Sequence, residues 1–417
     1  MKSFLKHILE NSISFLARAT IYRFKPVIIA VTGSVGKTSS KEAIWVALKN
    51  RFYSRKTSAN FNNELGVPLS VIGDYSEVSK PAWFFWLKVL LVGFWHFIFE
   101  SKNSYPQMLI LEYGADKPGD IAELISIAKP HVAVISAIGQ LPVHVENYPQ
   151  GIEQVAREKG KLISELSVDD FAVLNSDDPT VVKLKEKTRA KVITFGFEKD
   201  SNVRISNFKH IVNEGRIEGL AFKMENEGAS VPIILKNAFS ISHAYAAACA
   251  ACVGTIFDIN LIESANAFIL NYVPIKGRSV IIEGIKRTQI VDESYNSSPI
   301  ALEMALKTLK MVSHTRKIAV LGDMMELGDY TVKAHEMIGD LVPSCADILI
   351  TVGPRARFIA QRALKKDMDE KMVFSFDESE EAGLKLQELI KKGDLILIKG
   401  SRVIGLDKIV EEVKSVV

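Results

Sequence analysis

The sequence predicts an α/β protein with two main domains: a P-loop central domain built on a parallel sheet, and a C-terminal, doubly wound, Rossmann-like domain. Short apolar runs alternate with helical stretches from residue 27 to about residue 272, and the same alternation restarts after Pro274. A glycine-rich turn at residues 33–36 joins the first predicted strand to the first predicted helix. This order of elements is typical of parallel sheets that are covered by helices on both faces.

The predicted elements follow in order. Residues 1–25 are an amphipathic, basic segment of one helix or a helix pair. The central domain, residues 26–275, has short antiparallel strands between 203 and 235 and an Ala-rich buried helix at 241–254, preceded by parallel strands at 27–31, 108–111, 132–138, 171–175 and 191–195. The C-terminal domain, residues 276–417, has strands at 288–291, 317–321, 347–352, 372–376 and 394–399.

Composition excludes several classes of protein. The formal net charge is +3 with 24% charged residues, and no basic tract indicates a nucleic-acid partner. The three cysteines, Cys249, Cys252 and Cys345, cannot all pair, and the first two lie in an apolar stretch where core packing is expected rather than metal or redox chemistry. Residues 1–25 show no cleavage site of a secretory signal, so a reducing cytoplasm is expected.

The glycine-rich turn has residue types that suit a phosphate group. Glycines let backbone N–H groups face an anion, and the following helix, predicted at residues 41–50, adds partial positive charge. Lys37 can reach terminal phosphates and Thr38 can hold Mg²⁺. A G-x-x-x-x-G-K-T loop would need glycine at position 31, where this chain has Val31. The predicted nucleotide contacts of the loop are Gly33, Ser34, Val35, Gly36, Lys37, Thr38 and Ser39.

The loop instead has the form T-G-S-x-G-K-T-S, which resembles the ATP-dependent amide ligases of the Mur ligase and folylpolyglutamate synthetase superfamily. Six further segments resemble, in order, the Mur ligase branch that adds D-alanyl-D-alanine to a UDP-N-acetylmuramoyl-tripeptide. These segments are 60–69 (NFNNELGVPL), 111–116 (LEYGAD), 174–179 (LNSDDP), 291–299 (VDESYNSSP), 321–328 (LGDMMELG, with His335 after it) and 399–402 (KGSR).

The resemblance implies ATP and Mg²⁺ as cofactors and assigns roles to individual residues. Negative charge accumulates on a transferring phosphoryl group, so cations should dominate such a site. The implied catalytic residues are Lys37, Thr38, Glu112, His144 and Lys159, and the metal ligands among them are Thr38, Glu112 and His144. Glu112 ends a predicted buried strand, where an unpaired carboxylate would be costly. Lys159 occupies the position of a lysine that the family can carbamylate.

Further contacts are implied beyond the loop. The resemblance gives nucleotide contacts to Asn175, Arg278 and Asp292. Lys276-Gly277-Arg278 matches the G-R that opens the family's C-terminal domain, and Asp292 matches its ribose-binding acid. The implied substrate contacts are Asn60, Asn62, Asn63, Tyr295, Asn296, Lys399, Ser401 and Arg402.

Two departures from the family pattern keep a second hypothesis open. The family's N-I-G-x-x-H has Ala137 in place of asparagine and two extra residues before His144. Its H-N-x-x-N has lost both asparagines, to Ala244 and Ala247. These changes favour a membrane-associated nucleotide-binding scaffold without catalysis, whereas the intact P-loop lysine favours an enzyme.

Two regions are not explained by the shared motifs. The resemblance covers the family's central and C-terminal domains, and we expect the chain to lack the N-terminal UDP-sugar-binding domain. Residues 82–99, AWFFWLKVLLVGFWHFIF, form an apolar insertion that is borderline in length for a membrane span. Segments 60–69 and 111–112 must serve one active site, so a monotopic or re-entrant element is expected. The alternative is a protein–protein patch or a helix buried under residues 1–25.

The sequence therefore predicts an ATP-dependent, ADP-forming amide (peptide) ligase that acts through an acyl-phosphate. Its expected partners are a carboxylate acceptor that is a cell-wall precursor and an amine donor that is an amino acid or dipeptide, with no nucleic acid. A ligase acting on a non-UDP or lipid-linked carrier is the alternative enzyme. We expect a cytoplasmic protein with membrane-surface contact through residues 82–99 and the N-terminal segment.

Overall fold

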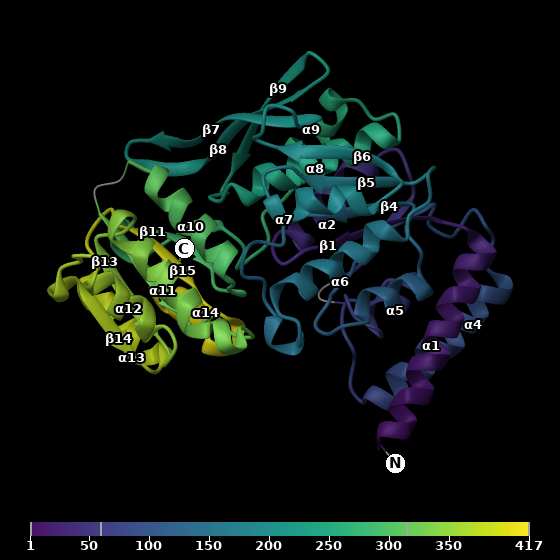
Figure 1. The fold of residues 1–417 in the computed structure, drawn as a ribbon, viewed down its shortest axis with the longest axis horizontal. Helices are drawn as coiled ribbons and strands as arrows, with labels where there is room; N and C mark the ends of the chain where they lie inside the picture. Colours follow the sequence, from purple (N-terminus) through teal and green to yellow (C-terminus); the bar gives the residue numbers. More distant parts are fainter. Residues whose placement is uncertain (1, 59–60, 314–315, 416–417) are drawn as a thin grey trace. The chain divides into compact units, whose positions relative to one another are not determined.

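The computed structural model describes residues 2–58, 61–313 and 316–415 (Figure 1). The chain divides into two compact units, each of which is described by itself. Unit 1 comprises Met1–Ile138, Asn147–Arg204 and Tyr245–Tyr272; unit 2 comprises Gly139–Glu146, Ile205–Ala244 and Val273–Val417. The α/β class is confirmed, and the predicted boundary between residues 275 and 276 stays a prediction.

Unit 1 is built on a parallel sheet. Its strands lie in the order β2 (Ser54–Lys56), β3 (Met108–Glu112), β1 (Val27–Thr32), β4 (Val132–Ile135), β5 (Phe171–Asn175) and β6 (Lys191–Gly196). Every neighbouring pair in this order is parallel, so all six carboxyl ends meet at one edge of the sheet. At this edge Val31 of β1 is in register with Glu112 of β3.

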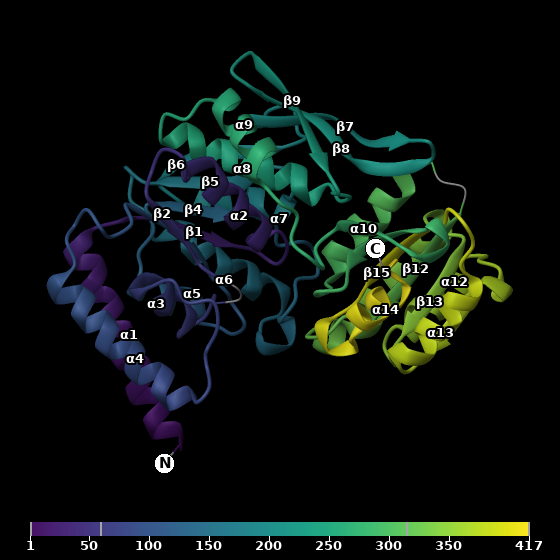
Figure 2. The ribbon, with the colours of Figure 1, turned by 180° about the vertical axis from the view of Figure 1, so that it is seen from behind.

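Helices cover both faces of this sheet (Figures 1 and 2). Ile28 and Ala30 of β1 belong to a core that also holds residues of α1 (Lys2–Phe24), α3 (Gly66–Ile72), α5 (Asp120–Ile127) and α6 (Ile152–Ser164). Since side chains alternate along a strand, Ile29 and Val31 face the other way. There α2 (Lys37–Leu48) packs on β1 and β3, and α9 (Leu261–Asn271) packs on α2. The remaining helices are α4 (Ala82–Phe99), α7 (Pro179–Lys183) and α8 (Ser242–Ile256).

Three strands follow β6 in the strand order: β7 (Val203–Asn213), β8 (Arg216–Asn226) and β9 (Ala229–Lys236). β8 and β9 are antiparallel. Both connecting turns have two residues with positive φ, Glu214-Gly215 and Glu227-Gly228, the conformation that tight hairpins favour. The predicted antiparallel pairing is confirmed for β8 and β9, but the strands are not short, since β7 and β8 have 11 residues each and β9 has 8.

Unit 2 holds a second sheet in the order β10 (Val280–Glu283), β11 (Gln289–Glu293), β15 (Leu395–Lys399), β12 (Lys317–Gly322), β13 (Ile348–Val352) and β14 (Val373–Phe376). All its pairs are parallel except β10 with β11. Its helices are α10 (Pro299–Met311), α11 (Thr331–Leu341), α12 (Arg357–Leu364), α13 (Ser379–Leu389) and α14 (Leu406–Val413). The Rossmann-like prediction is confirmed.

Two predicted bounds were wrong, and one strand was missed. The strand expected at 132–138 ends at Ile135, because the Ala137 carbonyl accepts the Ser34 N–H and the Ile138 N–H donates to Asp178. The helix expected from residue 41 begins at Lys37, directly after the glycine turn. Strand β10 was not predicted, since its apolar run, residues 280–282, is only three residues long.

Candidate active site

The glycine turn of unit 1 is anchored on the segment that follows β4. Its Ser34 N–H donates to the Ala137 carbonyl at 2.6 Å, and the Ser136 hydroxyl donates to the Val35 carbonyl at 2.6 Å. Gly36 has φ +83°, a left-handed conformation that glycine adopts without strain, and it is the N-cap of α2 with no side-chain cap. The turn therefore leads directly into a helix N-terminus at the carboxyl edge of the sheet, with Ser39 in the first turn of α2.

The residues at this helix N-terminus fit a phosphate group. The Ser34 hydroxyl is buried and has no hydrogen-bond partner among the described residues, so it can accept or donate to a ligand oxygen. Lys37 Nζ folds back over the turn, where it lies 2.8 Å from the Gly33 carbonyl oxygen. Backbone N–H groups at an uncapped helix N-terminus attract anions. Unit 1 therefore has a turn that could receive a phosphate group, and the nucleotide contacts of its residues stay a prediction.

Glu112 lies at the end of β3, beside this turn, and only 3% of its surface is exposed. The Thr38 hydroxyl donates to Glu112 Oε2 at 2.9 Å, and the Asn62 amide donates to Oε1 at 3.3 Å. Hydroxyl and carboxylate oxygens suit Mg²⁺, which usually takes one or two protein carboxylates and completes its shell with water and phosphate. Consistent with so sparse a site, no group of three or more His, Cys, Asp or Glu in the described part of the chain could hold a metal ion.

Lys41 belongs to the same cluster and was not among the predicted site residues. Its side chain is 1% exposed, and its Nζ donates to the Thr57 carbonyl at 2.7 Å and lies 3.8 Å from Glu112 Oε2. A buried lysine without nearby carboxylates would be strongly destabilising, so Glu112 compensates its charge. The available signal was its position on α2, one turn after Thr38, on the face that packs against β3.

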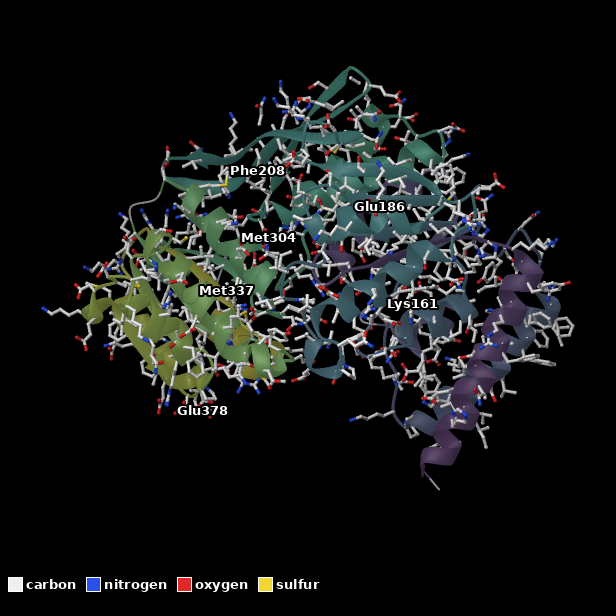
Figure 3. All side chains as sticks on the ribbon, viewed as in Figure 1. Lys161, Glu186, Phe208, Met304, Met337 and Glu378 are labelled. Carbon is white, nitrogen blue, oxygen red and sulfur yellow. The ribbon has the colours of Figure 1, made fainter. Side chains whose placement is uncertain are left out.

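Lys159, on α6, is buried and its Nζ lies 3.3 Å from the Gly33 carbonyl, the same acceptor that Lys37 uses. Burial, and after it the charge of Lys37, lower the pKa of Lys159 to about 7, although Asp116 and Glu158 act in the opposite direction. Lys161, two residues on, is by contrast partly exposed on the surface of α6 (Figure 3). Lys37 and Lys159, which are far apart in the sequence, thus both lie within hydrogen-bonding distance of the Gly33 carbonyl oxygen.

Two of the predicted substrate asparagines, Asn62 and Asn63, lie beside this cluster. Asn60 falls outside the described residues. Asn63 Oδ1 accepts the backbone N–H of Gly66 at 2.9 Å, so this side chain holds the start of α3. Next to it is a cavity of about 240 Å³ with a strongly polar wall. The cavity is lined by Asn62, Asn63, Glu64, Gly114, Asp116, Lys117, Asp120, Glu123 and Leu124.

Asn175 ends β5 at the same edge of the sheet. Its Oδ1 accepts the backbone N–H of Asp177 at 3.0 Å, which closes a turn before α7. Asp178 caps α7 and also accepts the Ile138 N–H at 2.7 Å. In the described structure Asn175 therefore shapes the loop after β5, and its nucleotide contact stays a prediction.

His144 lies in unit 2, in a left-handed conformation with φ +64°. Its Nδ1 lies 3.1 Å from Glu326 Oε2, which is a partner that the sequence did not indicate. Glu326 also has positive φ, so both residues sit in tight turns. The role of His144 as a metal ligand stays a prediction.

The other predicted residues of unit 2 gather around Tyr295. The Arg278 guanidinium lies 4.2 Å from the Tyr295 ring centroid and that of Arg402 lies 5.6 Å from it, which places two cations over one aromatic ring. Asp292 accepts the Gly277 N–H at 3.0 Å. Arginines held on an aromatic face keep their donors in a fixed plane, which suits phosphate recognition.

Lys399 and Ser401 follow β15 in the same unit. Lys399 Nζ is buried, lies 2.9 Å from Glu293 Oε2 and donates to the Asn296 carbonyl at 3.1 Å. The Ser401 hydroxyl accepts the Met325 N–H at 3.0 Å. These contacts join the loops after β11, β12 and β15, and so bring three of the predicted motifs together in unit 2.

Comparison with known proteins gives these features a family. The Mur ligase middle domain matches residues 91–251, and the Mur ligase glutamate ligase domain matches residues 277–402. The chain is 27% identical over 421 residues to the UDP-N-acetylmuramoyl-tripeptide–D-alanyl-D-alanine ligase of Rickettsia prowazekii, covering 97% of this chain and 82% of the relative. It is 30% identical over 392 residues to the ligase of the same name from Buchnera aphidicola subsp. Baizongia pistaciae, covering 92% and 75%.

Solved structures agree. The MurF ligase of Thermotoga maritima in complex with ADP is 25% identical, with a TM-score of 0.77 over 97% of this chain and 83% of that chain. A pseudomurein peptide ligase of Methanothermus fervidus, 17% identical with a TM-score of 0.65, shares the fold. These likenesses identify the protein as an ATP-dependent, ADP-forming amide ligase. The chain belongs to the Mur ligase family.

Proposed function

We propose that this enzyme joins D-alanyl-D-alanine to the carboxylate of a UDP-N-acetylmuramoyl-tripeptide, at the expense of ATP. The named relatives catalyse this reaction, and one observation in unit 1 carries the proposal. The phosphate-binding turn, the buried carboxylate Glu112 and two lysines on the Gly33 carbonyl meet at one edge of the sheet. In that combination Lys37 supplies a cation where a phosphoryl group would be transferred.

The proposed chemistry has two steps. A carboxylate oxygen of the acceptor attacks the γ-phosphorus of ATP and the bond to ADP breaks, which gives an acyl-phosphate. The amine of the donor then attacks the acyl carbon, the carbon–phosphate-oxygen bond breaks, and the nitrogen loses a proton, so that phosphate leaves as the amide forms. Charge builds on the phosphoryl oxygens in both steps, so Lys37 and the backbone N–H groups of α2 stabilise the transferring group.

We also propose that Mg²⁺ binds between Thr38 and Glu112. Their oxygens are already 2.9 Å apart, and the ion would neutralise charge on the ATP phosphates. Lys41 holds the Glu112 carboxylate from the protein side. His144 stays a further predicted ligand.

Lys159 is proposed as the site of the carbamate that the family resemblance implies. Only the neutral amine attacks carbon dioxide, forming an N–C bond and releasing a proton, and a lysine with a pKa of about 7 is largely neutral slightly above that pH. The product would be an anion where the free side chain is a cation.

The test is phosphate release from ATP, measured across a panel of acceptors and amine donors. We expect release that requires both the UDP-linked tripeptide and D-alanyl-D-alanine. If phosphate is released only when the acceptor is lipid-linked or carries no UDP, the enzyme is a ligase that acts on that other carrier. Nucleotide binding without release for any pair would support the scaffold alternative and overturn the ligase proposal.

The proposed reaction takes place in the cytoplasm, where ATP is available, with the enzyme peripheral on the inner face of the membrane. The exposed apolar helix α4 supports the peripheral location. The absence of a UDP-sugar-binding domain stays a prediction.

A further inference from the structure

Helix α4 has two opposite faces with different environments. Phe85, Val89 and Gly93 are buried in the core of unit 1. The opposite face is apolar and exposed: Trp83 is 69% and Leu91 62% exposed. The exposed apolar side chains of α4 are Trp83, Phe84, Leu87, Leu91, Phe94, Trp95, Ile98 and Phe99. We call this set the α4 stripe.

The buried face of α4 is fixed to the body of unit 1. A Cβ on Gly93 would lie 2.6 Å from Leu16 and 2.7 Å from Ile72, so glycine allows α4 to approach both α1 and α3 closely. Arg23 at the end of α1 donates to the Glu100 carbonyl at 2.7 Å, which fixes the C-terminal end of α4. A helix packed in this way along one face cannot be surrounded by lipid, so it does not cross a bilayer alone.

Helix α1 runs beside α4 and exposes apolar residues of its own (Figures 1 and 2). Phe15 is 72% and Tyr22 83% exposed, and both lie on a line with Ile8, at spacings of seven residues. Arg18 is exposed between Phe15 and Tyr22. Helices α1 and α4 thus both expose apolar side chains, and α1 exposes a cation among them.

Charge indicates the chemistry of the partner. Residues 2–25 carry five Lys or Arg and one acid, Glu10. Lys80, Lys88 and Lys102 are exposed at or near α4. In a twofold dimer such a basic surface would meet itself, which is unfavourable. An anionic lipid surface, in contrast, takes up both the cations and the apolar side chains, and tryptophans prefer that interface.

We propose that the α1–α4 pair lies flat in the interfacial region of an anionic bilayer, with the α4 stripe among the acyl chains and the cations of α1 at the headgroups. This inference rests on the peripheral location proposed above and specifies its surface, orientation and lipid class. At 1.5 Å per residue, the 18 residues of α4 give a contact about 27 Å long.

Flotation with vesicles tests the inference on the full chain. We expect it to float with phosphatidylcholine vesicles that contain phosphatidylglycerol, and to lose binding with pure phosphatidylcholine or at high salt. The double variant Leu91→Glu/Phe94→Glu should bind at least about tenfold more weakly, and Lys88→Glu about fivefold or more. Matched controls are Leu270→Glu and Lys333→Glu, which change exposed residues on α9 and α11 and should float as the parent does.

Several outcomes would overturn the inference: no flotation, equal binding to both vesicle types, resistance to carbonate extraction as expected of a spanning helix, or a dimer in solution that Leu91→Glu/Phe94→Glu dissociates. ADP binding by each variant confirms that it is folded. Phosphate release is measured with soluble substrates and without vesicles, so a failed ligase assay together with normal flotation would reject the proposed function and leave this inference standing.

Discussion

Replacing Lys159 with methionine should stabilise the protein at neutral pH although it removes a site residue. The folded environment lowers the pKa of Lys159 from 10.5 to about 7, and each pKa unit corresponds to about 1.4 kcal/mol. Holding this lysine therefore costs up to about 5 kcal/mol of unfolding free energy below pH 7. Methionine has a similar length and no charge, and it forfeits one hydrogen bond to Gly33, worth about 1 kcal/mol.

The sign follows from proton binding. Between pH 7 and pH 10.5 the unfolded state holds the Lys159 proton and the folded state does not, so parent stability rises with pH across that window. The advantage of Lys159→Met should be about 3–4 kcal/mol at neutral pH and should disappear toward pH 10.5. At roughly 2–4 °C per kcal/mol, the unfolding temperature should rise by about 6–16 °C at neutral pH.

Differential scanning fluorimetry measures the difference in unfolding temperature between Lys159→Met and the parent. The buffers are free of carbon dioxide and run from about pH 6.5 to about pH 10, which covers most of the window in which the difference should change. Lys129→Met, which changes an exposed lysine of the same unit, is the control and should show no such pH dependence. A gain that is the same at both ends of the range, or a variant less stable than the parent at neutral pH, would refute the reasoning. Turnover should be lost in Lys159→Met, whatever its stability.

Three further predictions concern single residues. Lys37→Ala should lower phosphate release at least about 100-fold with an unchanged circular dichroism spectrum; near-normal release would exclude this loop from catalysis. Glu112→Gln should raise the Mg²⁺ concentration needed for half-maximal release more than it weakens ADP binding, and an unchanged Mg²⁺ titration would make Glu112 a structural residue. Gly93→Val should cost about 1–3 kcal/mol of unfolding free energy and increase protease cleavage within α1, because a Cβ collides with Leu16; unchanged cleavage would contradict the close packing.

Strands were predicted well where they are buried on both faces. The runs at 27–31, 108–111 and 171–175 match β1, β3 and β5 within one residue, because central parallel strands are continuously apolar. Strand β10, which lies at the sheet edge antiparallel to β11, escaped prediction because its apolar run is only three residues long. The bounds near Ala137 depended on hydrogen bonds to residues far away in the sequence, which no local pattern encodes.

The same distinction applies to the candidate site. Lys37 and Thr38 were predictable from the residues alone, because the loop chemistry is local. Lys159 lies 126 residues from its acceptor Gly33, so only the family resemblance could place it there. Lys41 was missed because a lysine on a helix ordinarily extends into water, and its burial beside Glu112 appears only when α2 is packed against β3.

The arrangement of charges around Gly33 explains why these residues belong together. Two lysines donate to one carbonyl, and the charge of Lys37 contributes to the lowered pKa of Lys159. Such crowding is unfavourable in the free protein, since like charges in a buried site repel. A polyanion bound at the turn would compensate the charge of Lys37, and the proposed carbamate would remove the positive charge of Lys159, while Glu112 contacts Thr38 and Lys41. Binding of phosphate would thus relieve the electrostatic repulsion that is present in the free protein, and this relief would add to the affinity for phosphate. Such affinity suits an enzyme that holds ATP and a phosphorylated intermediate in succession.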